Sequence, residues 1–430
     1  MTQHAKFLAF LVAVAAGSAS AADSPPSSSG EVLPRLSADP EVAKVLRELP
    51  AGHAAILPKV RVTGDLNDVA RKYQLDERGP GGRNYCIEMV WMPDRRRAIY
   101  CGANHGGPHR LNDVWEYDLA ANTWVCLFAP DELNGGKDDA SRGAAWKTVE
   151  LREGILRTAR GGPAIVGHQW AQSTYDPRTG TMYFNSEWPF GYIPEPIRTA
   201  YLDTGKHKHE PPLWSFRPAT REWMPILPAR PAPRSGRALN KYLQFIPELG
   251  GCLYVDAAQS VGAWLFDPGA TRWKELLPGE ERAKNAGTNP ALPLRVGVKA
   301  YCPDLKTLVF CTSSATENRT VHYLVETNEW KQTATGPETP AAHISFTPCG
   351  YAPRAGAVLL YDQRVGRLWS YDVRRTAWSK LAPQGPPPPK EGGKVIGYFD
   401  PTHNVFVLSQ SEKVWVYRPE DSTRSGRGSK

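Results

Sequence analysis

The sequence predicts an all-β protein, a six-bladed β-propeller closed by a strand from near its N-terminus. Glycine (38 residues) and proline (39) are abundant, as in turn-rich β proteins, and 14 tryptophans recur at regular intervals. Two short patterns repeat along the 430 residues. With 41% hydrophobic and 22% charged residues, the chain can bury a large core, which argues against disorder and against a multi-span membrane protein.

Residues 1–21 have the features of a secretory signal peptide. Lys6 supplies a positive charge, an apolar run extends from Phe7 to Ala16, and small residues suited to cleavage follow. The run is about half of the roughly 20 residues that cross a bilayer, so no transmembrane anchor is expected. We therefore expect a periplasmic or secreted protein. Residues 22–35 then form a Pro/Ser-rich leader, residues 50–418 the propeller and residues 419–430 a disordered tail.

Charge and cysteine usage bound the partners. The formal net charge is +8. In an exported protein this favours an acidic glycan, and no nucleic-acid partner is expected. The seven cysteines lie mostly in apolar runs, and no C-x-x-C pair occurs. An oxidising compartment permits disulfides, but buried free thiols are the interpretation that we favour. The spacing excludes a zinc ribbon, and the sequence assigns no metal or other cofactor.

The first repeated pattern is a tryptophan followed nine positions later by a second one. Its copies are Trp115/Trp124, Trp214/Trp223, Trp264/Trp273 and Trp369/Trp378, with Val321/Trp330 as a variant and Trp415 opening a sixth. The second pattern, upstream of each, is an aromatic, any residue, a proline, four residues and three apolar residues. Its aromatics are Trp91, Tyr175, Phe245, Tyr301, Tyr351 and Phe399.

Each unit predicts four strands, named a to d in chain order, with a proline-led turn between a and b. The predicted blades span about 84–128, 164–228, 235–278, 295–332, 343–383 and 394–418. The last unit lacks a second tryptophan. The segment His53–Pro58 has the spacing with which other units end in Trp-x4-Pro. We therefore expect residues 53–58 to supply the missing strand and to pair the edges that would otherwise be open.

Two short sequence segments resemble a known family of repeats. LNDVWEYDLAANTW (111–124) resembles the end of a kelch repeat, and PRSGRA (233–238) resembles the start of one. The resemblance covers about residues 84–418 and implies the propeller fold, as in the central domain of galactose oxidase. The sequence departs from the family after strand b, where only the first unit has a double glycine, Gly106-Gly107. We interpret the chain as a divergent kelch-like propeller.

The lengths of the connections predict which face binds. All the long segments are b–c or d–a connections, and every a–b and c–d turn is short. Long loops on a rigid scaffold usually carry function. We therefore expect a site over the central channel on the b–c/d–a face. The run Arg95-Arg96-Arg97 falls on the opposite face, where solvation is its simplest role.

Candidate site residues follow from this placement. His105 and His109 share a glycine-containing b–c loop, and His168, Arg237 and His343 stand near the start of strand a in three blades. Histidines there can act as a general base or a metal ligand, although hydrogen bonding at the strand start is the structural alternative. Trp188 and Tyr192 belong to an aromatic loop suited to stacking on a sugar or to packing. His207-Lys208-His209 gives a weaker hint of a metal.

Enzyme signatures are mostly absent. The sequence contains no G-x-S-x-G, P-loop or H-E-x-x-H motif. The adjacent Tyr-His ligand pair of galactose oxidase has no match, nor do the repeated boxes of sialidases. The first hypothesis is thus an exported propeller that binds a carbohydrate or protein ligand without turnover. The alternative is a polysaccharide lyase or related enzyme on an acidic polymer, with His105 or His168 as base, Arg237 neutralising the uronate and Tyr192 as acid.

Overall fold

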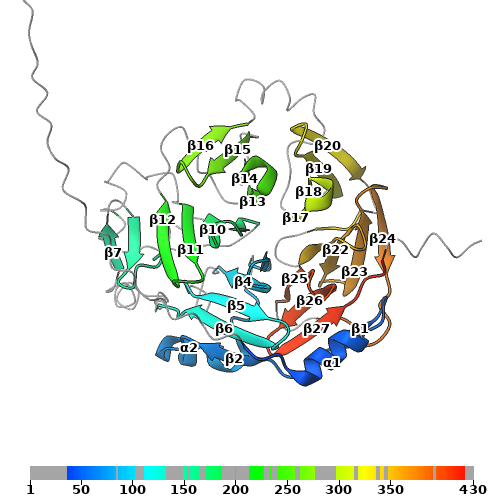
Figure 1. Cartoon of the computed structure of the whole chain (residues 1–430), viewed down its shortest axis with the longest axis horizontal. Coiled ribbons are helices and arrows are strands. Elements are labelled where there is room, and N and C mark those ends of the chain that lie inside the picture. The colour runs from blue at the N-terminus through cyan, green and yellow to red at the C-terminus, as the bar shows by residue number, and fades with distance from the viewer. Residues whose placement is uncertain are drawn as a thin grey trace, which may run out of the picture.

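The computed structural model is a ring of six β-sheets (Figure 1). It describes residues 36–83, 86–102, 111–131, 149–152, 155–164, 171–185, 199, 213–226, 233, 241–256, 262–276, 297–313, 318–335, 339–342, 347–390 and 394–421. The prediction of a six-bladed, nearly all-β propeller is confirmed. Every helix within these ranges is too short or too polar to span a bilayer.

The first three blades each contain four antiparallel strands in chain order. Blade 1 comprises β3 (Val90–Met92), β4 (Arg97–Cys101), β5 (Val114–Asp118) and β6 (Thr123–Phe128). Blade 2 comprises β9 (Ser173–Asp176), β10 (Thr181–Asn185), β11 (Leu213–Arg217) and β12 (Glu222–Ile226). Blade 3 comprises β13 (Lys241–Ile246), β14 (Gly251–Asp256), β15 (Gly262–Asp267) and β16 (Arg272–Glu275).

The last three blades repeat this plan. Blade 4 comprises β17 (Gly297–Cys302), β18 (Thr307–Ser313), β19 (Asn318–Leu324) and β20 (Glu329–Thr335). Blade 5 comprises β21 (Cys349–Ala352), β22 (Ala357–Asp362), β23 (Arg367–Asp372) and β24 (Ala377–Leu381). Blade 6 comprises β25 (Ile396–Asp400), β26 (Val405–Gln410) and β27 (Lys413–Tyr417), completed by β1 (Ala54–Ile56).

The predicted closure by an N-terminal strand is confirmed. β1 pairs antiparallel with β27, with Ala55 opposite Val416. Further main-chain hydrogen bonds tie Gly52 and His53 to Arg418. Around the axis, each inner strand contacts the inner strands of its neighbours, and β25 against β3 joins the last blade to the first. The two ends of the propeller sequence therefore meet in one sheet, and β1 covers the edge that β27 would otherwise expose.

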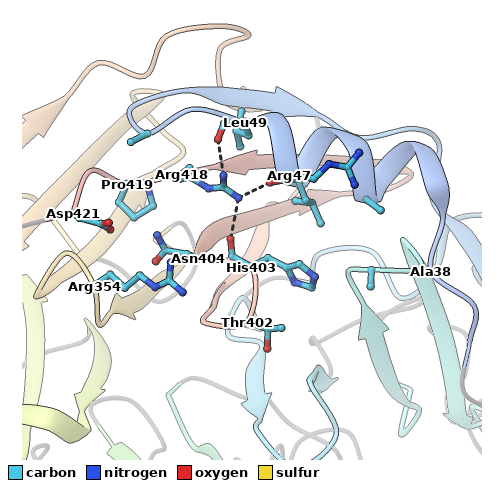
Figure 2. A pocket seen from close by; sticks show the side chains of 14 residues that line it. Ala38, Arg47, Leu49, Arg354, Thr402, His403, Asn404, Arg418, Pro419 and Asp421 are labelled. Carbon is cyan, nitrogen blue, oxygen red and sulfur yellow. Dashed lines mark hydrogen bonds between the residues drawn. The ribbon is translucent and has the colours of Figure 1, made fainter.

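Additional elements not expected from the repeat surround the first and last blades. The helix α1 (Pro40–Glu48) lies beside β1 and β27 (Figure 1). Its C-terminal end is fixed by Arg418, which donates to the carbonyl oxygens of Leu46 and Leu49 (Figure 2). The segment between the closing strand and blade 1 contains β2 (Arg61–Gly64), α2 (Asp68–Lys72) and α3 (Leu75–Arg78). β2 extends blade 1 by pairing parallel with β6. β7 (Val149–Arg152) and β8 (Ile155–Thr158) form a hairpin outside the blades.

The turns on one face follow one rule. Every a–b and c–d connection among the described blades is four residues long, and its fourth residue has a positive φ. Glycine holds this position at Gly180, Gly250 and Gly356, whereas Asn122 and Asn328 hold it in two c–d turns. A turn that ends in this left-handed conformation matches the twist of the paired strands. In blades 3 and 4 the a–b turn contains the short 3-10 helices η2 (Pro247–Leu249) and η3 (Pro303–Leu305).

The aromatic-x-Pro pattern joins neighbouring blades. In three blades its aromatic is a tyrosine, whose hydroxyl donates to the acidic residue that follows the proline of the preceding blade. These pairs are Tyr175 with Asp94 (2.8 Å), Tyr301 with Glu248, and Tyr351 with Asp304 (2.9 Å). Blade 3 has Phe245 instead, and the residue after the proline of blade 2 is Arg178, whose guanidinium lies 4.7 Å from the ring centre. The aromatic of one blade and the residue after the proline of the preceding blade thus pair in two ways, a tyrosine with an acidic residue or a phenylalanine with an arginine.

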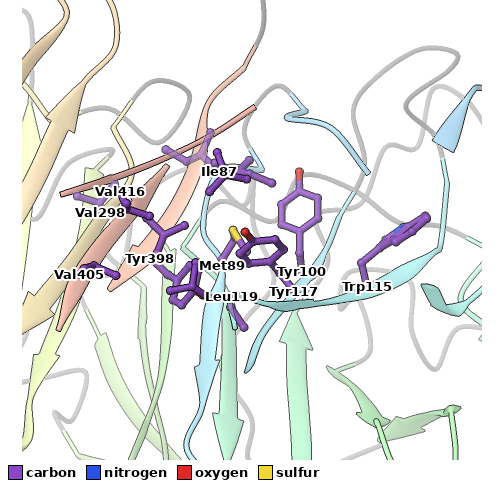
Figure 3. Packing of buried hydrophobic residues seen from close by; sticks show 14 of the residues in the cluster. Ile87, Met89, Tyr100, Trp115, Tyr117, Leu119, Val298, Tyr398, Val405 and Val416 are labelled. Atoms are coloured by element: carbon purple, nitrogen blue, oxygen red, sulfur yellow. The ribbon is translucent and has the colours of Figure 1, made fainter. Parts of the chain in front are cut away.

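The largest apolar cluster lies at the junction of blades 6 and 1 and extends toward blades 4 and 5 (Figure 3). Tyr117 packs edge-on against Tyr398 at 6.5 Å between ring centres, and Trp91 stacks on Tyr398 at 6.0 Å. All seven cysteines are free, and six of them are buried. Burial raises the pKa of thiols such as Cys252, so these side chains act as small apolar groups.

Candidate functional site

The two faces of the ring differ in how the strands are connected. Four-residue turns join all the a–b and c–d pairs on one face, which we call the short-turn face. The opposite face, which we call the long-loop face, carries the b–c and d–a connections. Among the latter, 186–212 between β10 and β11 and 276–296 between β16 and β17 each exceed a dozen residues. The rigid blades thus present long segments on one side only.

The residues predicted for the site lie outside the described residues. They are His105, His109, His168, Trp188, Tyr192, Arg237 and His343, together with His207 and His209. Their convergence over the channel stays a prediction. The strands that flank them are described, so the structure does give the base from which these segments extend.

A buried ion pair fixes the base of the loop that carries His105 and His109. Arg83 donates to both carboxylate oxygens of Asp113, at 2.9 and 2.6 Å, and to the carbonyl oxygen of Gly102 at 2.5 Å. The indole nitrogen of Trp115 donates to the same carboxylate at 2.5 Å. The side chains of Arg83 and Asp113 are 1% and 0% exposed.

This pair binds both ends of the loop at once. Gly102 immediately precedes residues 103–110, and Asp113 follows them closely. Burial opposes the charge of Arg83, but the attraction of Asp113 outweighs it and raises the pKa of Arg83 above its ordinary value. A fully paired bidentate contact is the arrangement in which a buried guanidinium is tolerated. The base of the loop is therefore rigid and charge-balanced.

A second ion pair crosses the propeller axis. Glu88 lies just before β3 in blade 1, and Lys299 lies in β17 of blade 4, on the opposite side of the ring (Figure 1). Lys299 Nζ binds the Glu88 carboxylate and donates to the carbonyl oxygen of Ser173 in blade 2 at 3.2 Å. The Cys349 thiol of blade 5 donates to the carbonyl oxygen of Lys299 at 3.1 Å. Side chains from three blades and a main-chain carbonyl from a fourth thus meet at the axis.

The electrostatics of this axial cluster are unusual for a structural pair. The Lys299 side chain is 1% exposed and that of Glu88 is 21% exposed. Burial raises the pKa of Glu88 above its ordinary value, although the positive charge of Lys299 and the backbone of Ser173 oppose the shift. A carboxyl group whose Oε2 is buried, whose pKa is raised by burial and which is paired with one cation is a candidate for a functional group.

The axial cluster links opposite blades across the axis. Glu88 stands at the start of strand a, which is the end of that strand nearest the long-loop face. A ligand bound there would therefore meet a charged floor. Among the described residues, no three His, Cys, Asp or Glu side chains come close enough to hold a metal ion.

The described histidines do not form a catalytic group with these charges. His322 is buried between blades 4 and 5, where its Nε2 lies 3.0 Å from the Tyr371 hydroxyl. Burial lowers its pKa to about 4, so the ring is neutral at physiological pH. His403 lies on the short-turn face, next to Asp400. The third described histidine, His53, has its Nδ1 3.0 Å from the Ala51 carbonyl oxygen, so all three have structural partners.

The expectation that Arg95, Arg96 and Arg97 are solvated on the short-turn face is wrong for two of the three. Arg95 binds the Glu116 carboxylate, which is fully buried, and Arg97 binds both Glu116 and Asp118 at 3.0 Å. Only Arg96 is exposed. Two arginines thus share one buried carboxylate, so ion pairs fix the turns of blade 1 on this face.

Sequence reasoning missed the charged residues at the axis and at the loop base. Lys299 stands two positions before the aromatic of the second repeated pattern, where Met89 and Leu243 stand in other blades. Glu88 stands three positions before it, where Val298 and Ile396 are found. A charge within an otherwise apolar strand position was the available signal. Asp113 offered no comparable signal, because it lies in a loop-like stretch.

Comparison with known proteins adds no family. The sequence matches no protein-family model and no curated protein. Similar solved structures include an oligogalacturonate lyase in complex with manganese (12% identity, TM-score 0.40, covering 79% of this chain and 90% of that one). TolB from Acinetobacter baumannii is 10% identical with a TM-score of 0.36, covering 70% of this chain and 55% of TolB. Hydrazine synthase from Kuenenia stuttgartiensis is 8% identical with a TM-score of 0.40, covering 76% of this chain and 74% of that one.

Proposed function

We propose that this chain is an exported, kelch-like propeller that binds an acidic carbohydrate on its long-loop face without turnover. The observation that carries the proposal is the asymmetry of the two faces. One face has uniform four-residue turns, and the connections 186–212 and 276–296 leave the blades from strand ends at the other face, where Glu88 stands at the start of strand a. A rigid scaffold that presents long loops over a closed floor is typical of a binding site.

Charge supports an acidic ligand. The chain carries 52 basic and 44 acidic residues, and removal of the proposed signal peptide takes away only Lys6 of these. The remaining balance is 51 − 44 = +7. Arg237, His105 and Trp188 on the long-loop face would supply a cation, a hydrogen-bonding ring and a stacking surface for a uronate sugar. A protein ligand with an acidic surface is the other partner that this charge fits.

A binding assay with matched variants tests the proposal. The mature chain is titrated with polygalacturonate, alginate and a neutral glucan by affinity electrophoresis and calorimetry. We expect saturable binding of a uronate polymer, weakened several-fold in Arg237→Gln and Trp188→Ala. Arg374→Gln, an exposed residue in a c–d turn on the short-turn face, should bind as the wild type does. Binding that is lost equally in Arg374→Gln, or no binding by folded protein, would contradict the proposal.

One observation favours an enzymatic alternative. β-Elimination from a uronate needs a group that neutralises the carboxylate and a group that accepts the α-proton. The axial cluster offers a carboxyl of raised pKa, Glu88, whose partner Lys299 is buried, so Arg237 would neutralise the uronate. A polysaccharide lyase that uses them beside His105 or His168 would release an unsaturated product. Ultraviolet absorbance during the same titrations, with and without a chelator, distinguishes the two functions, since pure binding yields no new absorbance.

A further inference from the structure

A cavity of about 560 Å³ lies on the short-turn face, at the seam where the ring closes (Figure 2). The C-terminal half of α1 forms one wall. The a–b turns of blades 5 and 6 and the residues that follow β27 form the others. We call it the seam pocket. Its volume falls within the range of pockets that hold small organic molecules, and it lies on the face opposite the proposed carbohydrate site.

The seam pocket has an excess of positive charge. Arg47, Arg354 and Arg418 contribute guanidinium groups to its lining, whereas Asp421 is the one carboxylate among the lining residues described. Arg47 has only a distant, exposed partner, Glu48, at 3.9 Å. Arg354 stands on the wall below Arg418, with its guanidinium directed into the same space (Figure 2). The lining therefore attracts an anion.

The charge of Arg418 is satisfied by hydrogen bonds but not by a carboxylate. Its two terminal nitrogens donate to the carbonyl oxygens of Leu49 (2.6 Å), Leu46 and His403 (3.2 Å), which are neutral acceptors. Its Nε is enclosed and has no acceptor among the described residues. Burial, and then repulsion from Arg354, lower the pKa of Arg418, while Asp421 opposes the shift only in part. A bound anion would offset this repulsion.

Apolar residues of α1 also contribute to the lining, on the side where Arg418 binds the carbonyl oxygens of Leu46 and Leu49. Leu46 and Leu49 are 3% and 7% exposed, and Ala43 and Pro419 line the cavity beside them. An inorganic anion would use only the charged residues. A molecule that carries an acidic group on an apolar body would use both.

We propose that the seam pocket binds an organic anion, with a carboxylate or phosphate group between Arg354 and Arg418 and an apolar part against α1. The pocket joins residues from both ends of the propeller, since α1 precedes the closing strand and Arg418 follows β27. Because such a ligand contacts both ends only when the ring is closed, it would stabilise the closed ring by linkage.

The test uses the mature chain in low-salt buffer with four probes, benzoate, phenyl phosphate, acetate and the neutral benzamide. Calorimetry measures affinity, and thermal unfolding measures stabilisation. We expect benzoate and phenyl phosphate to bind and to raise the unfolding temperature. Acetate should bind more weakly, because it lacks the apolar body, and benzamide should not bind measurably. Comparing benzoate with phenyl phosphate shows which acidic group the pocket prefers.

Two variants make the result specific. Arg354→Gln should weaken benzoate binding by roughly tenfold or more, the effect of losing a charged hydrogen-bond donor. Arg374→Gln removes the same charge from the same face outside the pocket and should leave affinity unchanged. Equal binding of benzamide and benzoate, or unchanged affinity in Arg354→Gln, would overturn the proposal. Arg237→Gln should retain benzoate binding, so failure of the carbohydrate proposal is distinguishable from failure of this one.

Discussion

Replacing Lys299 by methionine tests the axial ion pair most sharply. The change removes the cation that binds the Glu88 carboxylate and a donor to the Ser173 carbonyl. Removal of one partner from a buried pair typically costs about 3–5 kcal/mol, because the other charge stays buried without compensation. Glu88 can limit the cost by taking up a proton. From an ordinary pKa of 4.5, that protonation costs about 5 kcal/mol at pH 8 and about 1 kcal/mol at pH 5.

The protonation of Glu88 also sets the direction in which the free energy of unfolding changes with pH. A carboxyl whose pKa is raised in the folded state binds more protons there than in the unfolded chain, so stability decreases as pH rises through this window. Lys299→Met raises the pKa of Glu88 further, so its deficit in free energy of unfolding should be large at pH 8 and small at pH 5.

Urea unfolding followed by tryptophan fluorescence measures this deficit at both pH values. The double variant Lys299→Met/Glu88→Gln should recover most of the loss, since both charges are then gone, with a coupling energy of at least about 2 kcal/mol. Losses in the two single variants that simply add in the double variant, or a deficit that is equal at pH 5 and pH 8, would refute the interpretation of these residues as a coupled axial pair.

Three further predictions concern the scaffold. Burial lowers the pKa of His322 from 6.5 to about 4, so the free energy of unfolding should decrease by about 3 kcal/mol as pH falls from 6.5 to 4. His322→Gln should flatten this part of the pH–stability curve relative to wild type, and parallel curves would contradict the prediction. Ala55→Pro should lower stability by roughly 1–3 kcal/mol because proline removes a ladder hydrogen bond opposite Val416, whereas Ala55→Ser should not, as thermal unfolding would show. Tyr351→Phe should cost about 1 kcal/mol through loss of the bond to Asp304, and a neutral effect by urea unfolding would count against the inter-blade role of this hydroxyl.

The fold could be predicted because its signal is repeated. The spacing from Trp115 to Trp124 and the aromatic-x-Pro turns each recur with almost no gaps, so one physical requirement, a strand of fixed length between tight turns, appears several times. The closing strand at Ala54–Ile56 also followed from the repeat, because the last unit lacked its partner. In contrast, α1 and β2 occur once and belong to no repeat.

The site residues were harder to predict for a physical reason. Lys299 and Glu88 are 211 positions apart, and only the closed ring brings their side chains together across the axis. Arg83 lies before β3 and Asp113 just before β5, 30 positions later, and no local pattern encodes their contact. Similarly, the seam pocket combines α1 with Arg418 from the far end of the chain.

The most direct test of the account is titration of the mature chain with a uronate polymer while binding heat and ultraviolet absorbance are recorded together. We expect saturable heat without new absorbance, and a several-fold loss of affinity in Arg237→Gln but not in Arg374→Gln. A steady rise in absorbance would show an enzyme instead of a binding protein, and equal affinity in both variants would place the ligand away from the long-loop face.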